Sequence, residues 1–224
     1  MRLSKILFFT LILLIPLNLG KHFITADSYV WGVLVDYLIP TFYIQDLLAI
    51  LVLVFWVIED GFPKKEDLLE FITTRRNQVL IFFIVASGLS VVSAIRFVPS
   101  FFEFLRLLLY TLLAIYISYK VRAEKDLPVI LSLLSFEVIF LGLLGIFQYV
   151  KQASVFNNYL FFGEQPYSFS TWGIAKENVF GVYRVPAYGL FRHPNIFGGF
   201  LSVLLVWLLP NLRQKKRYFF SFVL

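Results

Sequence analysis

The feature of this sequence that most constrains its fold is a series of apolar runs separated by short charged stretches. Each run has about 15 to 24 residues, close to the ~20 residues that an α-helix needs to cross the ~30 Å hydrocarbon core of a bilayer. Continuous runs such as LLAILVLVFWVI do not alternate between polar and apolar residues, which argues against a membrane β-barrel. The six runs extend over residues 6–20, 42–58, 79–95, 101–119, 127–150 and 196–212.

Composition supports the membrane interpretation. Hydrophobic residues make up 59% of the 224 residues and only 15% are charged, with a mean hydropathy of +0.81, far above that of an ordinary soluble domain. We therefore predict an all-α, polytopic transmembrane helical bundle, in which residues 1–224 form a single transmembrane domain. It has six complete spans and the start of a seventh, because the apolar YFFSFVL follows Arg217 and the sequence then stops. This pattern is typical of the N-terminal portion of a longer protein, truncated at its C-terminus.

The charged residues around the apolar runs indicate how the chain is oriented in the membrane. Arg2 and Lys5 precede it, as in a cleaved signal peptide, but no small-x-small cleavage site follows, and five further runs do. An uncleaved first span is the better interpretation. Lys and Arg fall unequally on alternate loops, thirteen against six, with Arg106 left inside a run. Because positive charge concentrates on the cytoplasmic side, the N-terminus is predicted to be cytoplasmic, and residues 151–195 to form an extracytoplasmic loop.

Cysteine and histidine usage excludes several kinds of site. The sequence has no cysteine and two histidines, so it holds no disulfide framework, thiolate metal site or histidine-rich metal centre. We expect neither a metal nor a cofactor. The net charge of +6 follows the topology pattern rather than a basic face, so no nucleic-acid partner is expected. Multi-pass insertion in the bacterial cytoplasmic (inner) membrane is the predicted location.

The loop of residues 151–195 is the strongest candidate for a functional region, because loops this long are uncommon unless they have a function. Eleven of its residues are aromatic, which favours a position along the membrane surface. Its bases outnumber Glu164 and Glu177 on a face where positive charge is normally depleted, so an anionic ligand is expected. The four bases are Lys151, Lys176, Arg184 and Arg192.

The end of this loop predicts a helix start that can bind an anion. Pro194 suits the first helical turn, with His193 or a neighbour as the cap. The first N–H groups of a helix lack internal partners, and its dipole adds about half a positive charge there. Gly198 and Gly199 would let a lipid or another backbone approach closely. We predict a seat for a phosphate or diphosphate here. The predicted binding residues are Arg184, Arg192, His193 and Asn195.

The stretch GLFRHPNIFGGFL, residues 189–201, resembles the signature of the O-antigen ligase and O-antigen polymerase family of bacterial membrane proteins. That signature is Gly-x-Phe-x-His/Asn-Pro-Asn-x-x-Gly/Ala-x-x-Leu, and it likewise follows an extracytoplasmic loop and opens a transmembrane helix. GIFQYV, residues 145–150, is similar to the family's usual approach to that loop. The structural positions of this signature in the chain are Gly189, Pro194, Gly198 and Gly199.

The resemblance implies a membrane glycosyltransferase of lipopolysaccharide or other polysaccharide biosynthesis in the cell envelope. Such enzymes move a glycan from an undecaprenyl diphosphate carrier to an acceptor hydroxyl on a glycan, lipid or protein, at the outer leaflet. The family arginine that contacts the diphosphate stands three residues before the motif glycine, where this chain has Pro186; Arg184 or Arg192 would take its role. Family members have more spans and a second outer loop with a histidine, to which nothing here corresponds, so the segment alone is expected to be inactive and its catalytic residues are unassigned.

Other readings remain open from the sequence. A lipid-linked glycan flippase or transporter would place its functional charges within paired, broken helices, and a non-catalytic membrane fragment would need none of these residues. Glu137, in the middle of the fifth run, is predicted to be a structural carboxyl or the partner of an arginine on a neighbouring helix. Glu103 and Arg106 are expected to form a local ion pair, and Asp36 and Asp46 to be solvated.

Overall fold

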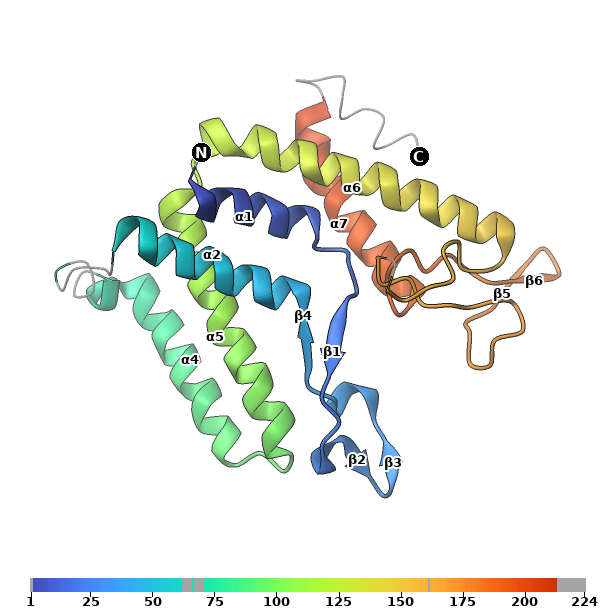
Figure 1. The fold of residues 1–224 in the computed structure, drawn as a ribbon, viewed down its shortest axis with the longest axis horizontal. Coiled ribbons are helices and arrows are strands. Elements are labelled where there is room, and N and C mark those ends of the chain that lie inside the picture. Colours follow the sequence, from blue (N-terminus) through green and yellow to red (C-terminus); the bar gives the residue numbers. More distant parts are fainter. Residues whose placement is uncertain (1, 62–65, 67–70, 161, 213–224) are drawn as a thin grey trace. The chain divides into compact units, whose positions relative to one another are not determined.

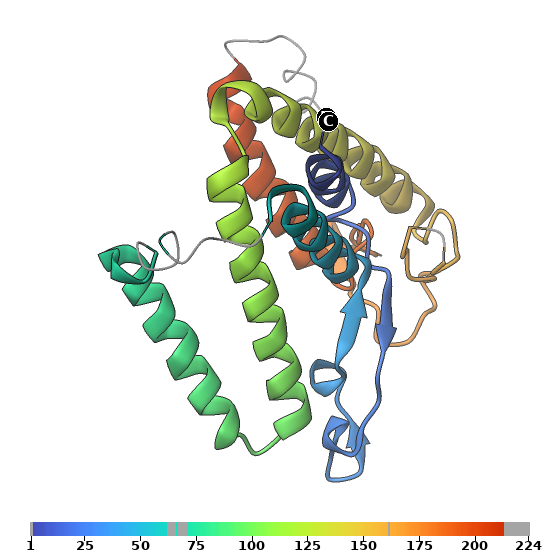
Figure 2. The same ribbon diagram turned by 60° about the vertical axis from the view of Figure 1, so that its left-hand side comes forward.

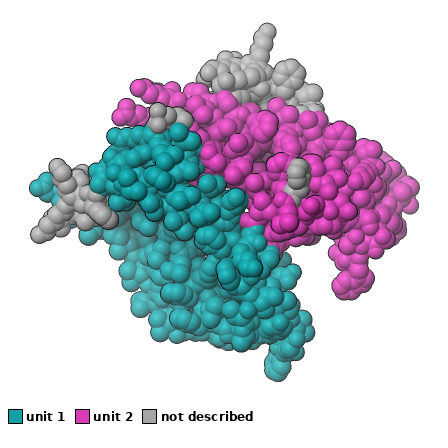
Figure 3. Space-filling model, in the orientation of Figure 1, with its two compact units in different colours: residues 1–8, 20–121 teal, residues 9–19, 122–224 magenta. Residues whose placement is uncertain are grey.

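The chain forms two compact units in the computed structural model, which describes residues 2–61, 66, 71–160 and 162–212 (Figures 1 and 3). The first unit comprises residues 1–8 and 20–121, and the second comprises residues 9–19 and 122–224. The boundary between them falls inside the first helix, α1 (Leu3–Leu13).

The prediction of an all-α bundle with six spans is wrong. Helices account for 63% of the structure, but the described residues also form three two-stranded antiparallel sheets. Among those residues, only two helices are long and apolar enough to cross a membrane: α5 (Phe97–Lys120) and α6 (Ala123–Lys151). At 1.5 Å per residue these are about 36 and 44 Å long, more than the ~30 Å of a hydrocarbon core.

Helix length is the physical reason for the difference. The first predicted run yields only the 11 residues of α1, because Pro16 lacks an N–H and disfavours helical backbone at the residue before it. The second run yields α2 (Ile44–Asp60), whose 17 residues include three carboxylates. In α4 (Arg75–Val92) and α7 (Pro194–Leu212), the described apolar portions are Asn77–Val92 and Pro194–Leu209, which are shorter than the ~20 residues of a transmembrane helix. Hydrophobic composition therefore located helices but overestimated how many could span a bilayer.

Loss of the six-span order also removes the basis for the predicted cytoplasmic N-terminus, because that assignment depended on loops alternating between two sides. The predicted start of a seventh run after Arg217 lies outside the described residues. So does most of EDLLEFI, residues 66–72, a stretch that the sequence also allows as a short surface helix.

In the first unit, α5 contacts both α2 and α4. Helices α4 and α5 run side by side in opposite directions, joined by a short turn (Figures 1 and 2). Residues 20–43, ahead of α2, form two small sheets and two short 3₁₀ helices. These are β1 (Gly20–His22) paired with β4 (Thr41–Tyr43), β2 (Tyr29–Val30) paired with β3 (Val33–Leu34), η1 (Ala26–Ser28) and η2 (Asp36–Leu38).

A buried ion pair joins α2 to α5. Asp46, only 3% exposed, accepts hydrogen bonds from the Tyr43 N–H (2.9 Å) and the Tyr110 hydroxyl (2.9 Å). Arg106 contacts the same carboxylate at 3.4 Å and also bonds Glu103 at 2.7 Å. The predicted Glu103–Arg106 ion pair is thus confirmed. The prediction that Asp46 is solvated is wrong, because its side chain is buried. Asp46 is buried because α5 packs against the start of α2. The position of Asp46 near a helix start does not reveal this contact.

A second polar cluster joins the first turn of α1 to the last turns of α2 and α5. Glu59 accepts hydrogen bonds from the Leu3 N–H at 2.6 Å and the Ser4 hydroxyl at 2.6 Å. Asp60 pairs with Lys120 at 2.7 Å and with Arg2. The hydrogen bond from Ser4 lowers the pKa of Glu59 below its ordinary value, and the one from Lys120 lowers the pKa of Asp60 in the same way. Both carboxylates are therefore favoured in their ionised form by the folded state.

These lowered pKa values predict loss of stability in acid. Above the ordinary pKa values of 4.5 and 3.8 the two carboxylates contribute their full stabilisation, which is lost as the pH falls through their lowered folded pKa values. Thermal unfolding followed by circular dichroism in detergent, from about pH 6 to about pH 3, should show a falling midpoint. A Glu59→Gln/Asp60→Asn variant should decline less steeply over that interval. An identical decline in both proteins would contradict the assignment.

In the second unit, α6 packs against α7 and the connecting segment folds over their junction. That segment contains the hairpin of β5 (Glu177–Val179) and β6 (Val182–Arg184), so the predicted loop has regular structure. Leu141, Leu144, Leu190 and Phe197 form the main buried cluster. Glu137 of α6 is 2% exposed, and neither of its carboxyl oxygens has a hydrogen-bond partner among the described residues.

Candidate functional site

The last turns of α6 hold the motif glycine through one side chain, Gln148. Its Oε1 accepts hydrogen bonds from the N–H groups of Tyr188 (3.1 Å) and Gly189 (2.7 Å). Its Nε2 donates to the carbonyl of Gly189 at 2.8 Å and to Glu164 at 2.7 Å. An amide offers two donors and two acceptor lone pairs, so every position is used. Because Gln148 is 1% exposed, these bonds fix the start of the motif to the helix.

Glu164 completes this anchor from the loop. Its carboxylate is fully buried and accepts hydrogen bonds from the N–H groups of Val155 (2.7 Å), Phe156 (2.5 Å) and Asn157 (3.2 Å), besides that of Gln148. Charge-assisted bonds of this kind compensate the cost of burying an ionised carboxylate. Glu164 is thus a structural acid that shapes the chain after α6, and its negative charge is already satisfied by protein groups.

Two glycines allow α6, the motif turn and α7 to meet at Phe197. Gly189 has φ +59°, a left-handed conformation, and a Cβ there would lie 2.7 Å from Phe197 Cδ2. A Cβ on Gly145 of α6 would lie 2.9 Å from Phe197 Cε1. Phe197 itself is 7% exposed. The two segments that carried the family resemblance, residues 145–150 and 189–201, are therefore packed directly against each other.

This packing predicts opposite results for two Gly→Ala changes within helices. Gly145→Ala should lower the free energy of unfolding by about 1–3 kcal/mol, since the new methyl overpacks the ring of Phe197. Gly198→Ala, with nothing within 4 Å of the added methyl, should be neutral or raise it by up to about 1 kcal/mol through helix propensity. Thermal unfolding in detergent measures both. Equal effects would show that the junction is loosely packed.

Arg184 is also positioned by the end of α6. It ends strand β6, opposite Glu177, and its guanidinium lies 5.7 Å from the centroid of the Tyr149 ring, within the range of a cation–π contact. The adjacent Val185 donates its N–H to Gln152 Oε1 at 2.8 Å. The consecutive residues Gln148 and Tyr149 thus position the motif glycine and the arginine, respectively.

Helix α7 begins at Pro194, as the sequence predicts. His193 caps it: its Nδ1 accepts from the Asn195 N–H at 3.2 Å, and its carbonyl accepts from Ile196 (3.1 Å) and Phe197 (3.2 Å). The ring of His193 is exposed and lies 6.4 Å from that of Tyr188, which donates its own backbone N–H to Gln148. The capping role uses Nδ1 as an acceptor, which leaves Nε2 to face solvent.

The remaining predicted residues surround this helix start. Arg192 is half-buried in the turn just before α7, and Asn195 is exposed in its first turn. Gly198 and Gly199 are exposed, with open space where a Cβ would project, which is consistent with close approach by another molecule.

Two residues that hold this candidate site together were not predicted from the sequence. Gln148 lies within GIFQYV, and a glutamine near the end of a long apolar helix is a signal that could have identified it. Glu164 gave a weaker signal, as one of only two carboxylates in a basic loop. Nearby, burial and then the charge of Glu164 raise the pKa of the Tyr167 hydroxyl, so this phenol stays neutral at physiological pH.

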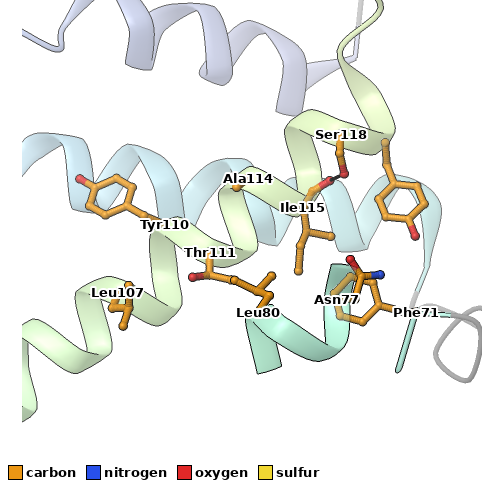
Figure 4. Close-up of a pocket in the computed structure, with 10 residues that line it drawn as sticks. Phe71, Asn77, Leu80, Leu107, Tyr110, Thr111, Ala114, Ile115 and Ser118 are labelled. Atoms are coloured by element: carbon orange, nitrogen blue, oxygen red, sulfur yellow. Dashed lines mark hydrogen bonds between the residues drawn. The ribbon is translucent and has the colours of Figure 1, made fainter. Parts of the chain in front are cut away.

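A groove in the first unit is lined by residues of α4 and α5 and by Phe71 (Figure 4). Its volume is about 690 Å³, and the hydroxyl of Ser118 on its wall is bonded to the Ile115 carbonyl at 2.7 Å. Among the described residues, its lining is apolar with scattered amide, hydroxyl and phenol groups. It is lined by Phe71, Asn77, Leu80, Leu107, Tyr110, Thr111, Ala114, Ile115, Ser118 and Tyr119.

Within the described ranges, no three histidine, aspartate or glutamate side chains are grouped closely enough to hold a metal ion. The N–H groups of Asn195, Ile196 and Phe197 are already bonded to His193, so the chemistry at the start of α7 is that of cations and one exposed imidazole. In comparisons with known proteins, no family model, no curated protein and no solved structure matches this chain.

Proposed function

We propose that the chain forms part of a membrane enzyme that transfers a glycan from an undecaprenyl diphosphate carrier to an acceptor hydroxyl, of the O-antigen ligase or polymerase type. One observation carries the proposal. The two segments that resemble this family, residues 145–150 and 189–201, contact each other through Gly145, Gln148, Gly189 and Phe197. If the family's site lies at this junction, the two segments that resemble the family should pack together although they are far apart in sequence.

Arg184 and Arg192 are the proposed diphosphate ligands. Diphosphate binds well to planar guanidinium groups, which can form two parallel hydrogen bonds with its oxygens. Arg184 is held beside the end of α6 by Tyr149, and Arg192 directly precedes α7. The Glu164 carboxylate is compensated within the loop by three backbone N–H groups and by the Gln148 amide.

The reaction would then depend mainly on positioning. The acceptor oxygen attacks the anomeric carbon of the carrier-linked sugar, and the bond from that carbon to the diphosphate oxygen breaks. The electron pair leaves with the diphosphate, whose charge the arginines stabilise. The proton of the acceptor hydroxyl passes to a base that these residues do not assign. Tyr167 does not suit that role, because its raised pKa keeps it protonated.

A location in the bacterial inner membrane is part of the same proposal. Helices α5 and α6 have 24 and 29 residues and are long and apolar enough to cross a bilayer. A lipid-borne donor is confined to such a membrane, so an enzyme using it must reach the bilayer surface. The long apolar α6 leads directly to Gln148 and Tyr149, which supports a donor site at the end of that helix.

Reconstitution into vesicles of the whole enzyme, of which the chain is proposed to form part, tests the proposal. Vesicles would carry an undecaprenyl diphosphate-linked oligosaccharide, with lipid A core or a growing polysaccharide as acceptor. The expected products are glycosylated acceptor and free undecaprenyl diphosphate, in equal amounts. Movement of the labelled donor between leaflets without transfer would instead favour a glycan flippase, and the absence of both activities would favour a non-catalytic membrane subunit.

A further inference from the structure

Each unit carries a β-hairpin with the same four-residue sequence pattern at its tip. In the first unit, β2 and β3 are joined within Val30–Trp31–Gly32–Val33, and in the second, β5 and β6 are joined within Val179–Phe180–Gly181–Val182. Both turns have two residues, and in both the flanking valines are paired across the strands. The shared pattern is valine, aromatic residue, glycine, valine.

The aromatic residue at each tip is in an unfavourable backbone conformation. Trp31 has φ +52° and Gly32 φ +78°, while Phe180 has φ +51° and Gly181 φ +85°. Positive φ at both central residues is the type I′ arrangement, for which Asn–Gly is the favoured dipeptide. A bulky side chain in the left-handed region costs about 1–2 kcal/mol. Turn geometry alone therefore disfavours an aromatic residue at the first central position in both hairpins.

Packing within the unit does not compensate this cost. Trp31 is 98% exposed and Phe180 is fully exposed at 103%. Phe162–Gly163 provides an internal comparison, since both of its residues also have positive φ. There the ring of Phe162 contacts Phe140 and Phe156 at 5.9 and 5.6 Å. The hairpin tips lack such neighbours, so their aromatic side chains are available to something outside the folded unit.

Both hairpins are attached to an end of a candidate membrane span. The hairpin of β2 and β3 follows η1, whose Asp27 accepts the Val98 N–H at 2.9 Å, in the first turn of α5. The hairpin of β5 and β6 ends in Arg184, which lies over Tyr149 in the last turns of α6. When α5 and α6 cross a bilayer, each span end lies at the level of the lipid headgroups, where tryptophan and other aromatic rings are enriched.

We propose that the tips of these two hairpins, Trp31 and Phe180 with their flanking valines, insert into the headgroup–acyl boundary of a phospholipid bilayer. Val33 and Val182 are 65% and 57% exposed, so each tip presents an aliphatic group beside its ring. Lipid accepts both groups, whereas binding of a sugar ring requires polar partners beside the aromatic face. Apart from the rings, the four-residue tips carry only valine side chains, and the Asn178 amide beside the second tip already accepts the Gly181 N–H at 2.8 Å. The inference does not depend on glycan transfer.

The absence of cysteine allows a direct test of this proposal. Single variants Trp31→Cys and Phe180→Cys would carry a nitroxide spin label in the full chain, reconstituted in phosphatidylethanolamine–phosphatidylglycerol vesicles. Asp36→Cys and Glu177→Cys, exposed positions near the bases of the same hairpins, are the matched controls. The ratio of collisions with oxygen to collisions with a water-soluble nickel chelate should be higher at 31 and 180 than at their controls.

Ratios at 31 and 180 that equal those at the controls would overturn the proposal, as would failure of the chain to bind the vesicles. So would tip labels that contact the nickel chelate freely and become immobilised only by a soluble oligosaccharide such as maltoheptaose, since the tips would then bind sugar. Trp31→Asn and Phe180→Asn test a purely structural role. Neither change should lower the unfolding temperature, because Asn–Gly suits the turn; a lower temperature would show that the rings serve folding instead.

Discussion

A Gln148→Leu variant is expected to lose on the order of 3 kcal/mol or more of unfolding free energy in the second unit. Leucine fills a similar space but leaves the Tyr188 N–H, the Gly189 N–H and the Gly189 carbonyl without their buried partner. Each buried group left without a hydrogen bond costs about 1–3 kcal/mol. Glu164 also loses one of its donors. Chemical denaturation of the purified chain in detergent measures the change.

Gln78→Leu is the matched control for this prediction. Gln78 is an exposed glutamine in α4, so the same substitution there should change the unfolding free energy by no more than about 0.5 kcal/mol. If Gln148→Leu is as mild as Gln78→Leu, the end of α6 does not organise the motif turn. In that case the contact between residues 145–150 and 189–201 could no longer support the proposed function.

In the whole enzyme of which the chain is proposed to form part, replacing Arg184 or Arg192 by alanine is expected to lower glycan transfer by about 10- to 100-fold each, and to abolish it when both are replaced. Charge-assisted hydrogen bonds to a ligand contribute about 1.5–3 kcal/mol, and each 1.4 kcal/mol corresponds to a factor of ten. The chain should still insert in membranes, because neither residue lies in α5 or α6. Transfer is measured in vesicles that contain the lipid-linked donor and the acceptor.

Lys176→Ala provides the control for lost charge in this part of the chain. Lys176 lies over the Phe169 ring at 4.3 Å, and it belongs to the same basic segment without being part of the proposed diphosphate site. It should retain transfer at close to the wild-type rate. Full activity in both arginine variants, or equal loss in the lysine variant, would contradict the assignment of specific diphosphate ligands.

The sequence predicted the positions of the long helices better than the turns and the burial of polar side chains. Apolar runs located α5 and α6 closely, because long uninterrupted stretches leave few alternatives to a helix. They did not reveal that Pro16 ends α1 early, or that Val-aromatic-Gly-Val forms hairpin turns. Aromatic residues are uncommon in type I′ turns, so a reading based on Asn–Gly or Asp–Gly does not find them. Tertiary packing also placed Asp46 in the interior, against the expectation from its position near a helix start.

In the candidate site, too, local features were predicted and long-range contacts were not. The position of Pro194 and the capping by His193 followed from local rules, since helix starts depend on a few adjacent residues. The contacts of Gln148 with Gly189, 41 residues away, depend on how the segment between α6 and α7 folds. Periodicity and spacing carry no information about such a contact. The resemblance indicated both segments, and the geometry adds that they are joined by Gln148 and Phe197.

The most direct test of the central claim is equilibrium binding of farnesyl diphosphate to the purified chain, measured by calorimetry in detergent. The account predicts binding that is tighter for farnesyl diphosphate than for farnesol, and at least about tenfold weaker in the Arg184→Ala/Arg192→Ala variant. Equal affinities for the diphosphate and the alcohol, or an unchanged affinity in the double variant, would contradict it.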